Sequence, residues 1–115
     1  YRYIVNSFPS RPISKGRYVK RYAFHGWDLM AFLGTTSYYI DDLSENDKML
    51  TENMRALVSE FVRNGTLLHY KPRWLPYPEC TALVGNDTVF VDKYSKEKCD
   101  FWTKTGLATK YSWVS

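Results

Sequence analysis

The sequence predicts one small α/β domain, and three features carry this prediction. Residues 1–7 and the short runs 81–84 and 88–91 are rich in β-branched and aromatic side chains, as strands are. Between them, apolar residues from Leu50 to Phe61 recur at steps of four, three, one and three, which places them in one stripe along a helix. The chain has 115 residues, enough for a single core.

The first third of the chain reads as a strand, a loop and a short helix. Pro9 ends the expected strand, and Pro12 and Gly16 mark an irregular loop. The apolar run 27–33, followed by Gly34, predicts a short helix or a turn, and residues 35–42 are expected to form an exposed connection. Because the strand starts at residue 1 without a lead-in, we expect the chain to be part of a longer polypeptide.

The central helix has clear signals at both ends. Ser44 is a good N-cap, and Glu45 and Asp47 fall in the first turn, where the helix dipole favours carboxylates. Asn64-Gly65 predicts the C-terminal end. We interpret this helix as scaffold that packs its apolar stripe into the core.

The last third predicts a loop, a hairpin and a terminal helix. Residues 69–78 contain three prolines, which argue against regular structure, and aromatic side chains that would pin the loop to a core. Gly85-Asn86-Asp87 is the expected hairpin turn. A short helix is expected within 95–113, with its aromatic rings, Phe101 and Trp102 among them, buried on the surface that it covers.

The distribution of charged and apolar residues indicates which classes of partner the chain could bind. Six basic residues precede the first acid, Asp28, and tyrosines lie among them in 17–22, as a single-stranded nucleic-acid site would require. There is no recognisable RNA-binding motif, however, and the chain from Asp28 onward is net acidic, so no nucleic-acid partner is expected. No apolar run approaches the roughly 20 residues that cross a membrane, and no signal-peptide pattern opens the chain.

His25 is the main candidate for chemistry. It is one of two histidines, it precedes Gly26, and Asp28 follows three residues later. Histidine exchanges protons near neutral pH, so a histidine at a tight turn could act as a general base. A packed, hydrogen-bonded histidine among aromatic residues explains the same pattern, and spacing alone leaves both interpretations open. The other histidine, His69, reads as a loop residue.

Four blocks together resemble a known family. They are the strand 1–7, HGWDLMAFLG at 25–34, the helix block that ends in EFVRNG at 60–65, and PRWLPY at 72–77 followed by KCDFW at 98–102. In this order and spacing they resemble the C-terminal end of type B carboxylesterases, the esterase–cholinesterase family of α/β-hydrolases. The resemblance covers essentially residues 1–115. It implies the C-terminal segment of an α/β-hydrolase domain, with a late sheet strand, histidine loop, amphipathic helix, hairpin and terminal helix that would not fold independently.

The resemblance also implies an activity, carboxylic ester hydrolysis by a serine esterase without metal or cofactor. His25 looks like the histidine of the catalytic triad, and Gly26 and Asp28 look like supporting residues of its loop. Many family members carry glutamate at the position of Asp28, and their triad acid comes from an upstream segment. The sequence contains no Gly-x-Ser-x-Gly. The isolated chain is therefore expected to be inactive, and its partners would be an ester substrate and the remainder of the domain.

The same family includes neuroligin-like cell-adhesion proteins, which keep the fold without turning over esters. Such a non-catalytic adhesion protein is the alternative function. Retention of His25 with Gly26 favours an enzyme, and the upstream serine would discriminate between the two.

The cysteines and two glycosylation motifs indicate the cellular compartment of the protein. Cys99 resembles a family cysteine that is bridged to an upstream cysteine, whereas Cys80 has no clear counterpart. The two could also bridge each other, or both could be free buried thiols. Asn64-Gly65-Thr66 and Asn86-Asp87-Thr88 are glycosylation sequons. Together with a bridged cysteine they favour a secreted or extracellular protein.

Overall fold

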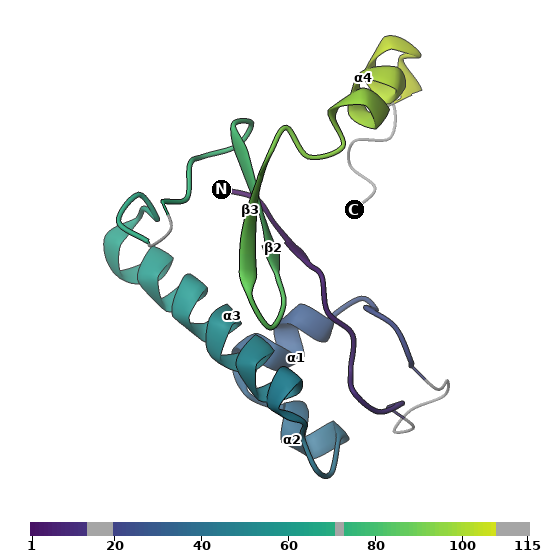
Figure 1. Cartoon of the computed structure of the whole chain (residues 1–115), viewed down its shortest axis with the longest axis vertical. Helices are drawn as coiled ribbons and strands as arrows, with labels where there is room; N and C mark the ends of the chain where they lie inside the picture. The colour runs from purple at the N-terminus through teal and green to yellow at the C-terminus, as the bar shows by residue number, and fades with distance from the viewer. Residues whose placement is uncertain (14–19, 71–72, 108–115) are drawn as a thin grey trace.

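The computed structural model describes residues 1–13, 20–70 and 73–107 of the chain (Figure 1). It has a small mixed α/β arrangement, as the sequence predicts at this coarser level. The elements, in chain order, are β1 (Tyr3–Val5), α1 (Trp27–Leu33), α2 (Thr36–Tyr39), α3 (Glu45–Asn64), β2 (Cys80–Val84), β3 (Thr88–Asp92) and α4 (Lys96–Lys104).

The three strands form one mixed sheet in the order β1-β2-β3. β1 runs parallel to β2, with Tyr3 opposite Ala82, and β2 runs antiparallel to β3, with Val84 opposite Thr88. The predicted hairpin is therefore confirmed. β1 is shorter than the predicted strand, because only residues 3–5 are paired along β2.

Helix α3 begins and ends where the sequence predicts. The Ser44 hydroxyl accepts a hydrogen bond from the Asp47 N–H, the Asp47 carboxylate accepts one from the Ser44 N–H, and Gly65 ends the helix at φ +64°. The apolar stripe is buried at Leu50, Met54 and Leu57 and becomes open toward its end.

The core lies between the helices and one face of the sheet. Helices α1 and α3 pack together, and α3 lies along β2 (Figure 1). Trp74 is 2% exposed, which confirms that the proline-rich loop is pinned to the core by an aromatic ring. The buried apolar residues are Ile13, Trp27, Ala31, Ile40, Leu50, Met54, Leu57, Leu67, Trp74, Cys80, Ala82 and Val84.

One expectation about exposure is confirmed for most of its residues and another is wrong. The connection 35–42 is exposed at five of its eight residues, although it contains the helical turn α2, which buries Thr36, and Ile40 directly after that turn is buried as well. The rings of α4 are not buried: Phe101 is 58% exposed and Trp102 is 51% exposed. α4 lies apart from helices α1–α3 (Figure 1), so these rings contact each other instead, with centroids 5.3 Å apart. The rest of the segment in which the short helix is expected, residues 108–113, lies outside the described residues.

Candidate functional site

His25 stands in a tight turn at the head of α1. The Trp27 N–H donates to the Phe24 carbonyl at 3.0 Å, and the Met30 N–H donates to the Gly26 carbonyl at 3.0 Å. Gly26 has φ +86°, a left-handed conformation that side chains with a Cβ rarely adopt. This turn leaves His25 exposed, and no hydrogen bond within the described part of the chain engages its ring.

Aromatic packing fixes the turn from below. Trp27 is 1% exposed, and its ring lies 5.9 Å from that of Phe24, which is half-buried. The Lys20 ammonium lies over the Phe24 ring, 4.7 Å from its centre. The residues on both sides of the His25-Gly26 pair are therefore anchored, while the imidazole itself projects from the core.

A hydrogen bond ties the head of α1 to strand β1. The Tyr3 hydroxyl donates to Oδ2 of Asp28 at 2.9 Å. Burial raises the pKa of Tyr3 to about 12, and the hydrogen bond and negative charge of Asp28 add to this effect. Tyr3 therefore remains a neutral donor at physiological pH. Asp28 is engaged with the sheet, and no hydrogen bond joins it to His25 among the described residues.

The outer edge of β1 is a second feature of this region. The Asn6 N–H donates to the Val84 carbonyl at 2.8 Å, and the Ala82 N–H donates to the Arg2 carbonyl at 3.0 Å. In a parallel pair these bonds turn the backbone groups of alternate residues toward β2, so those of Tyr3 and Val5 point to the opposite edge. No described strand pairs with that edge.

An apolar cavity of about 220 Å³ lies beside the same strand, between β1 and α3. Tyr1 and Tyr3 line it from the strand side, and Leu57 and Phe61 line it from the helix side. Phe61 is 45% exposed, and its ring meets that of Tyr1 edge-on at 5.9 Å. The indole N–H of Trp74, which also lines the cavity, is buried and has no partner among the described residues.

The two cysteines lie in different environments and do not bridge each other. Cys80 is buried at the start of β2, and Cys99 is exposed on α4. Of the alternatives that the sequence leaves open, the structure shows neither a Cys80–Cys99 bridge nor two buried thiols, because Cys99 is exposed on a helix that stands away from the strand that carries Cys80 (Figure 1). A bridge from Cys99 to a cysteine outside this chain stays a prediction.

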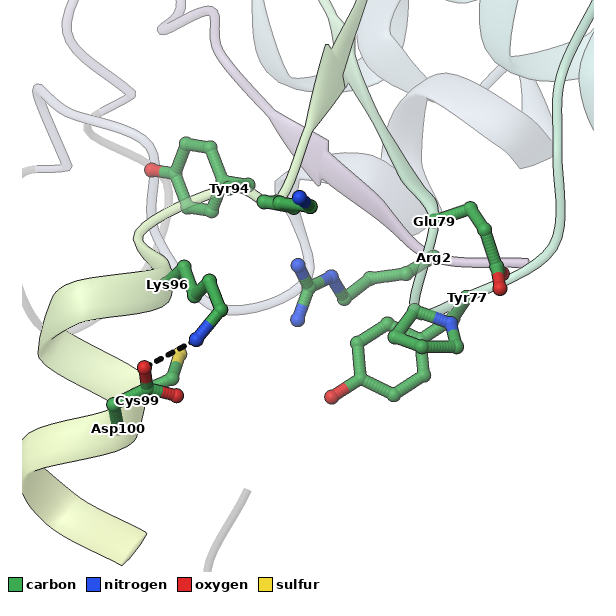
Figure 2. A pocket seen from close by; sticks show the side chains of 9 residues that line it. Arg2, Tyr77, Glu79, Tyr94, Lys96, Cys99 and Asp100 are labelled. Carbon is green, nitrogen blue, oxygen red and sulfur yellow. Dashed lines mark hydrogen bonds and ion pairs between the residues drawn. The ribbon is translucent and has the colours of Figure 1, made fainter.

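Cys99 lines a pocket of about 330 Å³ between α4 and the sheet (Figure 2). Arg2 lies directly before β1 and extends into the pocket, donating from Nε and Nη2 to the Thr81 hydroxyl at 2.8 and 2.6 Å. Its guanidinium also lies 4.5 Å from the centre of the Tyr77 ring. On the α4 side, Lys96 forms an ion pair with Asp100, and this hydrogen bond lowers the pKa of Asp100. Basic and acidic side chains thus both line the pocket.

The other predicted site residues are dispersed over the surface. His69 is exposed in a turn after α3, Asn64 is exposed at the end of α3, and Asn86 is half-buried in the hairpin turn. No group of three or more histidine, cysteine, aspartate or glutamate side chains within the described residues could hold a metal ion. None of the described helices combines the length and apolarity needed to cross a membrane.

Sequence reasoning missed Tyr3 as a partner of the histidine turn. Strand alternation places Tyr1, Tyr3 and Val5 on one face, which could have identified Tyr3 as facing the helices. Nothing local, however, identifies Asp28 as its partner, 25 residues away. No protein-family model, curated protein or solved structure matches this chain.

Proposed function

We propose that this chain is the C-terminal segment of a type B carboxylesterase-like protein, whose parent hydrolyses carboxylic esters through an acyl-serine intermediate. In this proposal His25 is the triad histidine, and the serine and the triad acid come from the remainder of the domain. The exposed imidazole of His25 on an anchored turn, which no hydrogen bond engages among the described residues, is the observation that carries the proposal.

The chemistry requires such a side chain. As the serine hydroxyl attacks the ester carbonyl, Nε2 of His25 takes the hydroxyl proton, and it then gives that proton to the leaving alcohol. In the second half of the reaction, His25 takes a proton from water, which attacks the acyl-serine, and returns that proton to the serine. A base in both steps must face the substrate and keep a fixed position. The Gly26 turn and the buried Trp27 ring meet the positional requirement.

Asp28 would act as a positioning residue in this reaction. Its carboxylate is tied to Tyr3 on β1, so the first turn of α1 is held against the sheet. The triad acid of this family follows the nucleophile and precedes the histidine in the chain. An Asp28 that is committed to Tyr3 is consistent with a separate, upstream triad acid.

The proposal requires an incomplete sheet, and it is supported by the outer edge of β1, with which no strand of the described residues pairs. A free strand edge is a site for adding another strand, and proteins usually cover or blunt it. The apolar cavity beside β1 would receive side chains from such a strand, and Phe61 at its rim would be covered. We propose that the remainder of the parent domain supplies this strand.

Hydrogen exchange at the backbone amides of β1 tests whether another strand pairs with its outer edge. The Ile4 N–H points to β2, whereas those of Tyr3 and Val5 point outward. In the parent protein we expect slow exchange at all three amides, because a neighbouring strand would pair the outward ones. Fast exchange at Tyr3 and Val5 beside slow exchange at Ile4 would show that the edge is unpaired and would contradict the proposal.

The activity is tested in the parent protein with a matched pair of histidine variants. His25→Gln should lower the kcat for a p-nitrophenyl ester by at least about 10³-fold. His69→Gln should leave the kcat unchanged, because His69 lies in an exposed turn after α3. Full activity in His25→Gln would overturn the assignment. The isolated 115-residue chain should show no hydrolysis above buffer.

A covalent organophosphate label separates the enzyme from the adhesion alternative. The label should attach to a serine in a Gly-x-Ser-x-Gly sequence of the parent protein. A parent with a replaced serine, no label and no turnover would instead support the neuroligin-like function.

A further inference from the structure

The structure distinguishes the two sequons by what their side chains do. In the first, the Asn64 amide donates to Glu60 at 2.7 Å. The Thr66 hydroxyl is hydrogen-bonded to the Tyr1 hydroxyl at 2.6 Å and accepts from the Leu68 N–H at 3.2 Å. Both residues therefore have a local structural role, which accounts for their presence without any modification.

The second sequon contains a hydroxyl that the fold does not use. Thr88 opens β3, and its Oγ1 is buried without a partner among the described residues. Buried polar groups are nearly always hydrogen-bonded, so an unpaired one calls for an explanation. Valine has the same β-branched shape, favours strands and would avoid the unpaired hydroxyl. The hydroxyl at this position therefore suggests a requirement outside the fold, and an N-glycosylation sequon is such a requirement.

Asn86 is held by its backbone and leaves its side chain available. The Asn53 side-chain amide donates to the carbonyl oxygens of Gly85 and Asn86, at 2.9 Å each. These bonds fix the hairpin turn onto α3. The Asn86 side chain makes no hydrogen bond within the described part of the chain, so its amide nitrogen is free to carry a substituent without loss of a fold contact.

A cleft of about 360 Å³ adjoins Asn86. The side chains of Asn6, Asn46 and Asp87 line it, and none of them makes a hydrogen bond among the described residues. Phe8, which is 65% exposed, adds an aromatic surface. Amide and carboxylate groups beside an exposed aromatic ring suit a sugar, which hydrogen-bonds through its hydroxyls and packs its apolar ring face on aromatic carbon.

We propose that Asn86 carries an N-linked glycan and that its first sugar lies in this cleft against Phe8. In the modification, Nδ2 of Asn86 attacks the anomeric carbon of a lipid-linked oligosaccharide diphosphate. An N-glycosidic bond forms, the sugar–phosphate bond breaks, the lipid diphosphate leaves and the amide loses one proton. This inference rests on the secretory location that accompanies the proposed function, and not on the catalytic role of His25.

The occupancy test uses the parent protein, secreted from eukaryotic cells behind a supplied leader. Enzymatic deglycosylation in ¹⁸O water converts each occupied asparagine to labelled aspartate, which peptide mass spectrometry locates. We expect the label at Asn86. Thr88→Ser should keep it and Thr88→Val should abolish it, while Thr66→Val leaves it unchanged. Secreted protein without a label at Asn86, including one labelled only at Asn64, overturns the inference whatever the esterase activity.

The cleft is tested by the rate at which the glycan is released from the folded protein. A sugar seated against Phe8 is shielded from the deglycosylating enzyme, so Phe8→Ser should speed native release several-fold. Release from the denatured proteins should be equally fast for both. Equal native rates would show that the first sugar does not lie in this cleft.

Discussion

Replacement of Asp47 by alanine should open the start of α3. Asp47 is 2% exposed, and its carboxylate accepts from the backbone N–H groups of Ser10 and Ser44, at 3.1 and 3.0 Å. It also accepts from the hydroxyls of both serines, at 2.8 Å for Ser44. One carboxylate therefore caps the helix and binds the segment after β1 to it.

The free-energy cost of Asp47→Ala comes from the hydrogen-bond donors that lose their partner. The N-cap bond itself remains in Asp47→Ala, because the Ser44 hydroxyl can still accept from the backbone N–H of residue 47. A buried donor without a partner costs about 1–3 kcal/mol, and two backbone N–H groups, partly buried here, would lose theirs. A total of about 3 kcal/mol is expected, which corresponds to roughly a hundredfold change in a local opening equilibrium. Asn46→Ala is the matched control, because Asn46 is exposed in the same turn and should change stability by less than about 0.5 kcal/mol.

Hydrogen exchange in the purified parent protein measures this local opening directly. The Lys48 N–H, which donates to the Ser44 carbonyl at 3.1 Å, should exchange about a hundredfold faster in Asp47→Ala. It should be unchanged in Asn46→Ala. Exchange within about threefold of the unsubstituted protein in Asp47→Ala would refute the reasoning, because the carboxylate would then contribute little to the cap.

The same carboxylate gives a pH dependence with a definite sign. Burial by itself raises the pKa of Asp47, but the hydrogen bonds from Ser10 and Ser44 outweigh it and lower the pKa. The folded-state value thus lies below the unfolded one, about 3.9. The stabilisation is present above about pH 4 and is lost as the pH falls through the folded-state pKa. Protection of the first turn should decline in that window in the unsubstituted protein and not in Asp47→Ala.

Five further substitutions test other contacts by denaturation of the purified parent protein. Folding raises the pKa of Tyr3 from 10.0 to about 12. The stability linked to its neutral form is therefore complete below pH 10 and is lost as the pH rises toward 12. Tyr3→Phe should remove this loss of stability at high pH. Thr81→Val should cost about 1–3 kcal/mol, because the buried Thr81 accepts two hydrogen bonds from Arg2, whereas Thr81→Ser should retain most of the stability. Leu57→Ala should cost about 2–5 kcal/mol, because Leu57 is 3% exposed, and Phe61→Ala should cost less, because Phe61 is 45% exposed. Equal effects within either matched pair, or a pH profile unchanged by Tyr3→Phe, would contradict these assignments.

Helix α3 could be predicted from the sequence because its signals are local. The cap at Ser44, the spacing of Leu50, Met54 and Leu57, and Gly65 all act within a few residues of one another. The same holds for α1, which ends at Gly34, and for the hairpin around 85–87. In each case the residues that decide the structure are neighbours in the chain, so the pattern alone contains the answer.

Exposure of the α4 rings could not be predicted in this way. An apolar pair such as Phe101 and Trp102 indicates that a surface is available to be covered, but the covering element lies elsewhere in the chain. Local pattern likewise gave an exposed connection at 35–42, although Ile40 reaches the core. The burial of a side chain depends on how whole elements pack against one another. The ends of a helix, in contrast, depend on capping residues that lie next to them in the chain.

The candidate site also could not be predicted in full from local sequence patterns. His25 is visible in the sequence, but the contacts that place its turn join distant residues. Tyr3 reaches Asp28 over 25 residues, Ser10 reaches Asp47 over 37, and Arg2 reaches Thr81 over 79. All three begin in the first ten residues, which therefore tie α1, α3 and β2 together.

This arrangement makes the histidine turn dependent on strands that lie far before and far after it in the chain. A parallel pair needs a long crossover, and the crossover from β1 to β2 contains His25, α1 and α3. β1 can hold Asp28 through Tyr3 only while β1 itself is held by β2. The hydrogen bonds of Arg2 to Thr81 strengthen that pairing from the side chains. The position of His25 is thus set by residues 55 or more places later in the chain, which explains why its local sequence alone left two interpretations open.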